Sequence, residues 1–466
     1  MTTTLPKPPA SAPPRRPWQS LALALALTWG GITGPLQAPT LAQDGDYGSG
    51  DPALQNMDGF TPDLVSKIEM IEQNWQHDYE KYLQLPPGQP ATRARDVIAA
   101  LSNADLAAQT RTAFLWIAAN ENHLALTLLT GEGEAIHRLV PIPRDRVMQV
   151  IRLWIGGITD PLSPPNRYLP PSQQLYQWMI APLEPTLKAE NIDTLIFCMG
   201  QGLRSLPLGA LHDGQGFLVE RYSLARVPAF SLADLAYNPL TNSQVLAMGA
   251  SEFSDQPPLP AVPLEMDIIT QELWPGEAFL NEEFTLDNLR HQRQQQPYGI
   301  IHLATHADFQ PGDPANSYIQ LWDSRLGLDH LDELNWDDPM VDLLVLSACK
   351  TAIGDISAEL GFAGLALQAG VKSALASLWS VSDVGTLVLM TEFYNQLDQV
   401  TSKAEALRQA QLALLHGTAK IDKAQDQAME LSLRGRSLPE GIILENPENF
   451  SHPFYWSAFT LVGSPW

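Results

Sequence analysis

The sequence predicts an α/β fold in which helices cover both faces of a mostly parallel sheet, preceded by a helix and a small β-meander. Three observations support this prediction. Short apolar segments alternate with helical segments from residue 192 onward, which is typical of parallel α/β sheets. Pro62–Leu83 carries apolar residues at helical spacing. Residues 111–139 contain three short apolar runs separated by polar residues, which indicates a meander.

The chain begins with a segment, residues 1–43, that has the three parts of a secretory signal peptide. It contains three basic residues and no acidic one, then an apolar run at 21–32, then small residues at 40–42. The run is shorter than the roughly 18 residues of a membrane-spanning helix. We therefore expect a cleaved signal, an exported protein and no stable membrane insertion. An uncleaved anchor and a disordered proline-rich tail are the alternatives.

Residues 44–190 are expected to form an N-terminal region that flanks the sheet. After a linker rich in Gly and Asp, this region contains the helix and the meander, followed by helical stretches at 146–154 and 172–187. No period of about 34 residues recurs, so stacked helical repeats are not predicted.

Residues 191–466 are expected to form the parallel sheet and its covering helices. The strand candidates are 194–198, 245–249, 278–280, 299–304, 343–347 and 373–379. The helix candidates are 265–273, 286–293, 359–368, 384–397 and 404–415. In such sheets, catalytic and ligand-binding groups gather at the carboxyl ends of the strands.

Length and composition exclude several classes of protein. The chain has 466 residues, 45% hydrophobic and 17% charged, so wholesale disorder is excluded. With 28 Lys and Arg against 52 Asp and Glu, the net charge is -24, and no chain-wide positive field attracts nucleic acid. Two cysteines are too few for a disulfide framework or a Cys-based zinc site. No calcium loop of the Asp-x-Asp-x-Asp-Gly type occurs, so we expect no metal and no other cofactor.

Two predicted strands each deliver a reactive side chain just past the carboxyl end. Strand 299–304 is followed by His306, and strand 343–347 is followed by Cys349. On neighbouring parallel strands these residues would form a pair in which the imidazole activates the thiol and then protonates the leaving amine. The alternatives are buried packing for the cysteine and a structural hydrogen bond for the histidine.

Three residues near His306 are further candidates. The backbone N–H groups of Cys349 and of Ala307 could form an oxyanion hole. Asp308 could orient His306. His302 shares a face with His306 under strand alternation, and we expect it to have a structural role that orients the site.

Seven motifs carry a resemblance to a known family. They are GLRSLPLGALHDG at 202–214, IIHLATHAD at 300–308, LLVLSACKTA at 343–352, LGFAGLA at 360–366, GVKSALASLWSVSD at 370–383, ALRQAQ at 406–411 and PFYWSAF at 453–459. In this order they resemble the CHAT domain, the bacterial branch of the caspase-like cysteine peptidases that also includes separases. The resemblance implies a caspase-like fold over residues 191–466 and maps the catalytic pair onto His306 and Cys349.

Two departures from relatives bear on the oxyanion hole and on specificity, respectively. Caspases and metacaspases place a glycine after the catalytic histidine, where this chain has Ala307. Metacaspases place an aspartate two residues before the cysteine to bind basic side chains, where this chain has Ser347. Asp383 is the best remaining acid for a specificity pocket, and capping the following helix is its alternative role.

The function expected from these features is that of a caspase-like cysteine endopeptidase. It would cleave protein substrates through a thioacyl intermediate on Cys349, with His306 as general base and then acid. The alternative is a catalytically silent caspase-like module that binds partners in a regulatory or signalling assembly. The expected partner is a protein substrate or regulator. We expect Cys349 to be free and Cys198 to pack in a strand; a disulfide between them is the alternative.

Overall fold

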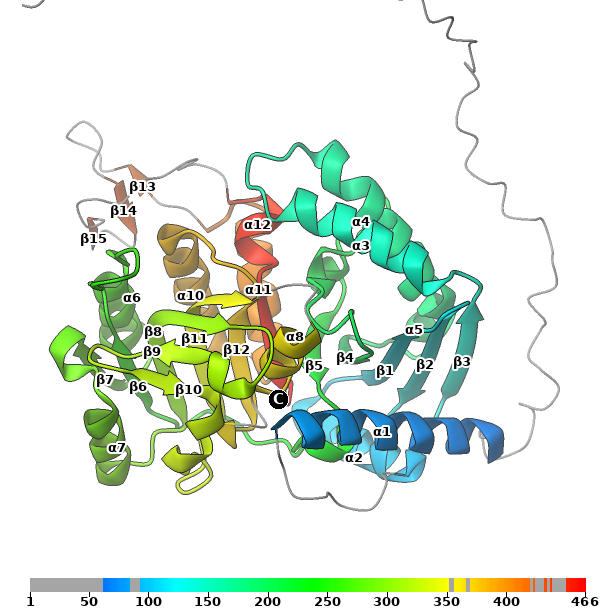
Figure 1. Ribbon diagram of the computed structural model, residues 1–466, viewed down its shortest axis with the longest axis horizontal. Coiled ribbons are helices and arrows are strands. Elements are labelled where there is room, and N and C mark those ends of the chain that lie inside the picture. The colour runs from blue at the N-terminus through cyan, green and yellow to red at the C-terminus, as the bar shows by residue number, and fades with distance from the viewer. Residues whose placement is uncertain are drawn as a thin grey trace, which may run out of the picture. The chain divides into compact units, whose positions relative to one another are not determined.

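The computed structural model of the chain describes residues 62–83, 93–351, 356–365, 369–419, 422–423, 431–433, 436–437 and 450–466. Within these residues thirteen strands form one sheet, with helices on both faces (Figure 1). Its strands are β1 (Thr112–Ala119), β2 (Leu124–Thr130), β3 (Ala135–Val140), β4 (Thr194–Met199), β5 (Ser223–Val227), β6 (Val245–Gly249), β7 (Gly276–Leu280), β8 (Ile300–Phe309), β9 (Tyr318–Gln320), β10 (Arg325–Gly327), β11 (Leu343–Thr351), β12 (Ser373–Ser377) and β16 (Phe459–Gly463). A separate small sheet contains β13 (Asp422–Lys423), β14 (Leu431–Leu433) and β15 (Arg436–Ser437).

The described helices surround this sheet. They are α1 (Pro62–Leu83), α2 (Ala94–Ala108), α3 (Arg144–Ile158), α4 (Pro165–Met179), α5 (Glu184–Ala189), α6 (Val262–Ile268), α7 (Leu286–Gln295), α8 (Ile356–Ala363), α10 (Asp383–Leu397), α11 (Lys403–Leu415) and α12 (Pro453–Trp456).

The sheet is parallel over most of its width. β7, β6, β8, β11 and β12 run parallel in that order, and β16, β5, β4 and β1 form a second parallel block. An antiparallel pair of β12 and β16 joins the two blocks. β2 and β3 continue the sheet beyond β1. At the other side, β9 pairs with the second half of β8, and β10 pairs with β9. The predicted α/β fold with a mostly parallel sheet is therefore confirmed, and the meander extends the same sheet.

Alternation along β1 shows how the sheet separates two apolar layers. Phe114 and Trp116 pack in a cluster with residues of α1 and α2. Leu115 and Ile117 pack in the larger cluster, which includes α3 and α4. Successive side chains of a strand point to opposite faces, so a strand buried on both faces is apolar throughout.

Several predicted boundaries were wrong for physical reasons. The strand expected at 299–304 continues to Phe309, because β9 and β11 pair with its second half. The strand expected at 343–347 likewise continues to Thr351, because pairing with β8 resumes at Ala348 after a bulge. The single helix expected at 172–187 is α4 and α5 with a short 3₁₀ turn between them. Pro182 lies in that turn, and a proline cannot donate the hydrogen bond that an uninterrupted helix needs.

A buried carboxylate contributes to holding the helix α1 on the sheet. Glu72 accepts hydrogen bonds from Trp116 Nε1 at 2.6 Å, from the Phe230 backbone N–H at 3.2 Å and from the Ser231 backbone N–H at 3.3 Å. Farther along α1, Tyr79 and Leu83 pack against Leu360 of α8. α1 therefore connects the meander end of the sheet to the helix that follows the strand of Cys349.

Replacing Trp116 by phenylalanine should lower the free energy of unfolding by about 1–3 kcal/mol, because it removes a donor from a buried carboxylate. Trp154→Phe is the matched control. Trp154 is equally buried, and its indole N–H has no hydrogen-bond partner among the described residues. Urea denaturation of the two variants gives the difference due to the Glu72 bond. Equal losses in both would show that this bond does not stabilise the fold.

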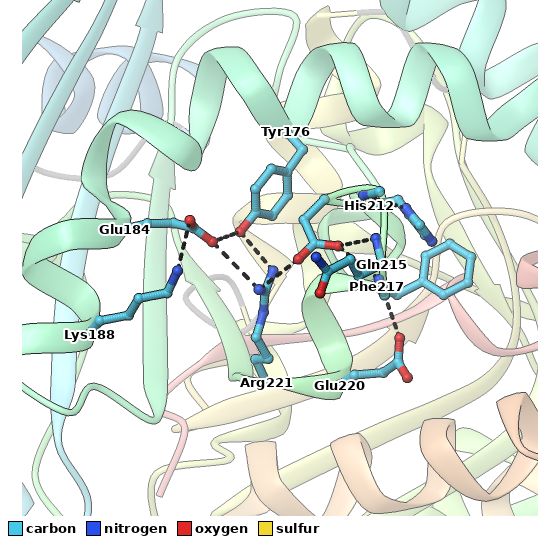
Figure 2. Close-up of polar contacts among 11 residues, drawn as sticks. Tyr176, Glu184, Lys188, His212, Gln215, Phe217, Glu220 and Arg221 are labelled. Atoms are coloured by element: carbon cyan, nitrogen blue, oxygen red, sulfur yellow. Dashed lines mark hydrogen bonds and ion pairs between the residues drawn. The ribbon is translucent and has the colours of Figure 1, made fainter.

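A second polar cluster fixes the turn of residues 213–216, which begins at the end of the 202–214 motif (Figure 2). Arg221 donates to Asp213 at 2.8 Å and to Tyr176 Oη at 2.7 Å, while Tyr176 donates to Glu184. Asp213 also accepts the backbone N–H groups of Gln215 and Gly216. Because these contacts satisfy the turn internally and join it to α4 and α5, the cluster is structural.

Candidate active site

β8 and β11 are neighbouring parallel strands, and the two proposed catalytic positions lie one register step apart on them. In the backbone register, Ala348 pairs with His306 and Cys349 pairs with Ala307. Both catalytic candidates therefore lie inside paired strands, which corrects the expectation that they follow the strand ends. The side chain of Cys349 lies outside the described part of the chain.

The imidazole of His306 contacts the loop of residues 250–261, which connects β6 to α6. Its Nε2 lies 2.9 Å from the carbonyl oxygen of Pro257, and its ring centroid lies 4.7 Å from that of Phe253. A carbonyl oxygen can only accept, so Nε2 carries the hydrogen and Nδ1 holds the lone pair of the neutral ring. The contact thus selects the tautomer whose basic nitrogen is Nδ1.

Burial lowers the pKa of His306 below its ordinary value. The hydrogen bond to Pro257 and the charge of Asp255 oppose this effect without reversing it. The imidazole is therefore predominantly neutral at neutral pH, which is the form that a general base requires.

His302 is fully buried and is held from two helices. Its Nε2 lies 2.9 Å from Glu265 Oε1 of α6, and its Nδ1 lies 3.2 Å from Tyr394 Oη of α10. Both ring nitrogens are thus used in the interior. His302 is placed to fix β8 against α6 and α10, four residues before His306 in the same strand.

The two residues that follow His306, Ala307 and Asp308, lie in the second half of β8. Ala307 lies between two paired strands, opposite Cys349 of β11 and Ile319 of β9. Residues in such a position commonly use backbone groups in the sheet ladder, and the role of Ala307 as an oxyanion donor stays a prediction. Asp308 is partly exposed, and among the described residues no hydrogen bond joins it to His306. The Pro257 carbonyl is the group that binds the ring.

Asp383 is the first residue of α10, and its carboxylate is turned toward the backbone of another element. Its Oδ2 accepts the backbone N–H of Ala261 at 2.6 Å. Burial raises the pKa of Asp383 to about 7, and the charge of Glu265 adds to this effect. The residue that caps α10 is Ser382, whose side chain accepts the N–H of Gly385. The capping role considered for Asp383 therefore belongs to the preceding residue, Ser382.

The two cysteines are far apart in the sheet. Cys198 is buried and free, and its Sγ lies 3.2 Å from the Pro228 carbonyl oxygen. In the strand order β11-β12-β16-β5-β4, four spacings separate the strands of Cys349 and Cys198. At ~4.8 Å per spacing this is roughly 19 Å, whereas a disulfide needs Cα atoms within about 7 Å. The fold therefore excludes a disulfide between them.

Sequence reasoning missed Phe253 and Pro257, the residues that hold the His306 ring. Their loop follows the carboxyl end of β6, which pairs with the first half of β8. The rule that functional groups gather at the carboxyl ends of parallel strands, which pointed to β8 and β11, applies equally to β6. The signal was therefore available, but neither residue type is chemically reactive.

Neither metal ligation nor membrane crossing is indicated in the part of the chain that the structure describes. No group of three or more His, Cys, Asp or Glu side chains is arranged there to hold a metal ion. No helix there combines the length and the apolar character needed to cross a bilayer. The expected signal peptide, residues 1–43, lies outside the described residues.

Comparison with known proteins identifies one family. The model of the CHAT domain family matches residues 169–464. No curated protein matches the chain. Two crystal structures of the Saccharomyces cerevisiae separase–securin complex, at 2.6 and 3.0 Å resolution, are similar to it with 10% identity and TM-scores of 0.49 and 0.47. These similarities cover 86% of this chain and 34% of the matched chain, so this protein spans about a third of its length.

Proposed function

The chain belongs to the CHAT domain family, and from this premise we propose that it is a caspase-like cysteine endopeptidase. Cys349 is the nucleophile and His306 is the general base and acid. The single observation that supports the proposal is that β8 and β11 are neighbouring parallel strands, in which Cys349 pairs with Ala307, the residue after a neutral histidine with a defined basic nitrogen.

The chemistry follows from these two groups. Nδ1 of His306 accepts the thiol proton, and the Cys349 sulfur attacks the carbonyl carbon of the scissile peptide bond. The C–N bond then breaks as His306 protonates the leaving amine, which leaves a thioester on Cys349. Water attacks the thioester carbonyl, His306 takes a proton from that water, and the proton returns to the sulfur when the acid product leaves.

The substrate and the location of the protein are parts of the same proposal. The partner is a protein substrate or regulator, because the net charge of -24 does not favour nucleic acid. Residues 1–43 direct export of the chain, since they have the three parts of a secretory signal.

A thiol-directed electrophile should label Cys349 and not Cys198 in the native protein. Burial raises the pKa of Cys198 well above its ordinary range, and the thiolate is the reactive form. Purified full-length protein is treated with iodoacetamide and mapped by peptide mass spectrometry, and is then offered a peptide library. We expect labelling of Cys349 to stop all cleavage of the library.

Denaturant supplies the control, because Cys198 should become reactive once the sheet unfolds. Labelling of native Cys198 at the rate of Cys349 would contradict the assigned burial. Cleavage that continues after complete labelling of Cys349 would contradict the proposed nucleophile.

A further inference from the structure

The loop that holds His306 is itself fixed at several points. Within the loop, the Leu259 N–H donates to the Ser251 carbonyl oxygen at 2.9 Å. Asp255 forms an ion pair with Arg325 of β10 at 2.7 Å. These contacts fix the loop at residues 251, 255 and 259, on both sides of Phe253 and Pro257. The position of Pro257 depends also on how the loop ends at α6.

The end of the loop is anchored by a residue from a different helix. Ala261 is the N-cap of α6 and has no side-chain acceptor of its own. The first N–H groups of a helix have no partner within the helix and must find one elsewhere. Asp383 supplies that partner from the first turn of α10, at 2.6 Å. One carboxylate thus fixes the junction between the loop and α6.

Buried polar side chains lie near this contact. Glu265 lies one turn along α6 from Ala261, and its charge acts on Asp383. Glu265 binds His302 of β8, which binds Tyr394 of α10. Asp383, which is partly exposed, therefore lies close enough to feel the charge of a buried polar group that connects α6, β8 and α10.

We propose that Asp383 is a positioning residue for His306, acting through Ala261 and the 250–261 loop, and not an acid that binds a substrate side chain. This inference rests on the proposed function of His306. The carboxylate is already engaged with a backbone N–H. Loss of that anchor would free the end of the loop and move the Pro257 carbonyl. The His306 ring would then no longer be held in one tautomer and one orientation.

Two substitutions and a matched control test the proposal. Asp383→Ala removes the acceptor, whereas Asp383→Asn keeps an uncharged oxygen that can still accept from Ala261. Asp287→Ala replaces an exposed acid in the first turn of α7 and is the control. We expect Asp383→Ala to lower kcat by about 10- to 100-fold with little change in KM, since small misplacement of a catalytic group has effects of this size. Asp383→Asn should restore part of the loss.

A readout independent of turnover is the NMR titration of the His306 ring, assigned by its absence in His306→Gln. The pKa of His306 should rise toward its ordinary value in Asp383→Ala, because the loop no longer shields the ring from water. It should stay at the wild-type value in Asp287→Ala. An unchanged His306 titration in Asp383→Ala would overturn the proposal. So would a changed preference for the substrate residue before the cleaved bond.

The pH dependence of folding stability gives a second check on the Asp383 carboxylate. The folded-state pKa of Asp383 is raised to about 7, so its protonated form stabilises the fold at low pH and this contribution is lost as pH rises through 7. Asn resembles the protonated acid, so Asp383→Asn should have a higher Tm than wild type at pH 8. A Tm below that of wild type would argue against the buried, ionised carboxylate.

The two proposals fail in distinguishable ways. If the wild-type protein cleaves no peptide, the proposed function fails, and the His306 titration still decides whether Asp383 positions the ring. If the wild type cleaves and Asp383→Ala cleaves equally well, the endopeptidase proposal stands and the positioning role is overturned.

Discussion

Replacing Cys349 by alanine should reduce peptide cleavage by roughly 10⁴-fold or more, because removing the nucleophile of a covalent mechanism removes the intermediate itself. Alanine fits the end of β11 without a new polar group, so the fold should be retained. The measurement is kcat/KM on the best peptide from the library, with circular dichroism as the test of folding.

Cys198→Ala is the matched control for this experiment. Cys198 is buried in β4, about four strand spacings from Cys349, so its loss should leave cleavage close to the wild-type level. Cleavage by Cys349→Ala at the wild-type rate would refute the enzyme. If Cys349→Ala retains the biological effect of the protein, the silent interaction module is the better description.

Periodicity predicted those elements whose sequence has a strong local signal. The helix Pro62–Leu83 was predicted with the observed bounds, because large apolar side chains recur along one of its faces. The helix α2 was missed, because much of its buried face consists of alanines, which give a weak pattern. β5 and β16 were missed because polar residues interrupt their short apolar runs, Ser223 and Arg226 in β5 and Thr460 in β16.

The site was predictable only where a reactive residue coincides with a strand. His306 and Cys349 were placed from two apolar runs and from the rule on strand ends. The continuation of those strands through both residues depends on pairing of β8 with β9 and β11, which local sequence does not specify. Pairing partners are tertiary information, so the predicted ends came too early.

The role of Asp383 shows a second limit of sequence reasoning. Its position before a helix is compatible with a cap, a pocket acid or a contact to another element. The choice depends on Ala261, which is 122 residues away in the chain. Only the fold brings the start of α6 to the start of α10 and so identifies the carboxylate as an external cap for Ala261.

Replacing His306 by alanine should lower kcat/KM by about 10²- to 10⁴-fold, the range expected for loss of a general base and acid. His291→Ala is the control, because His291 is an exposed histidine of α7. The alanine variant should still be alkylated at Cys349, although more slowly, because the thiol remains while its proton acceptor is gone. Undiminished cleavage by His306→Ala would remove this residue from the mechanism.

The pH profile of wild-type kcat/KM should show the titration of His306 as the general base. Burial holds the pKa of His306 below its ordinary value of 6.5. A base acts only when neutral, so activity should persist as pH falls to 6.5 and should decline only as pH passes through the lower folded-state value. Asp383→Ala, which uncovers the ring, should move this decline to higher pH. A decline centred above 6.5 in the wild type would mean that the ring is not desolvated as its contacts with Phe253 and Pro257 require.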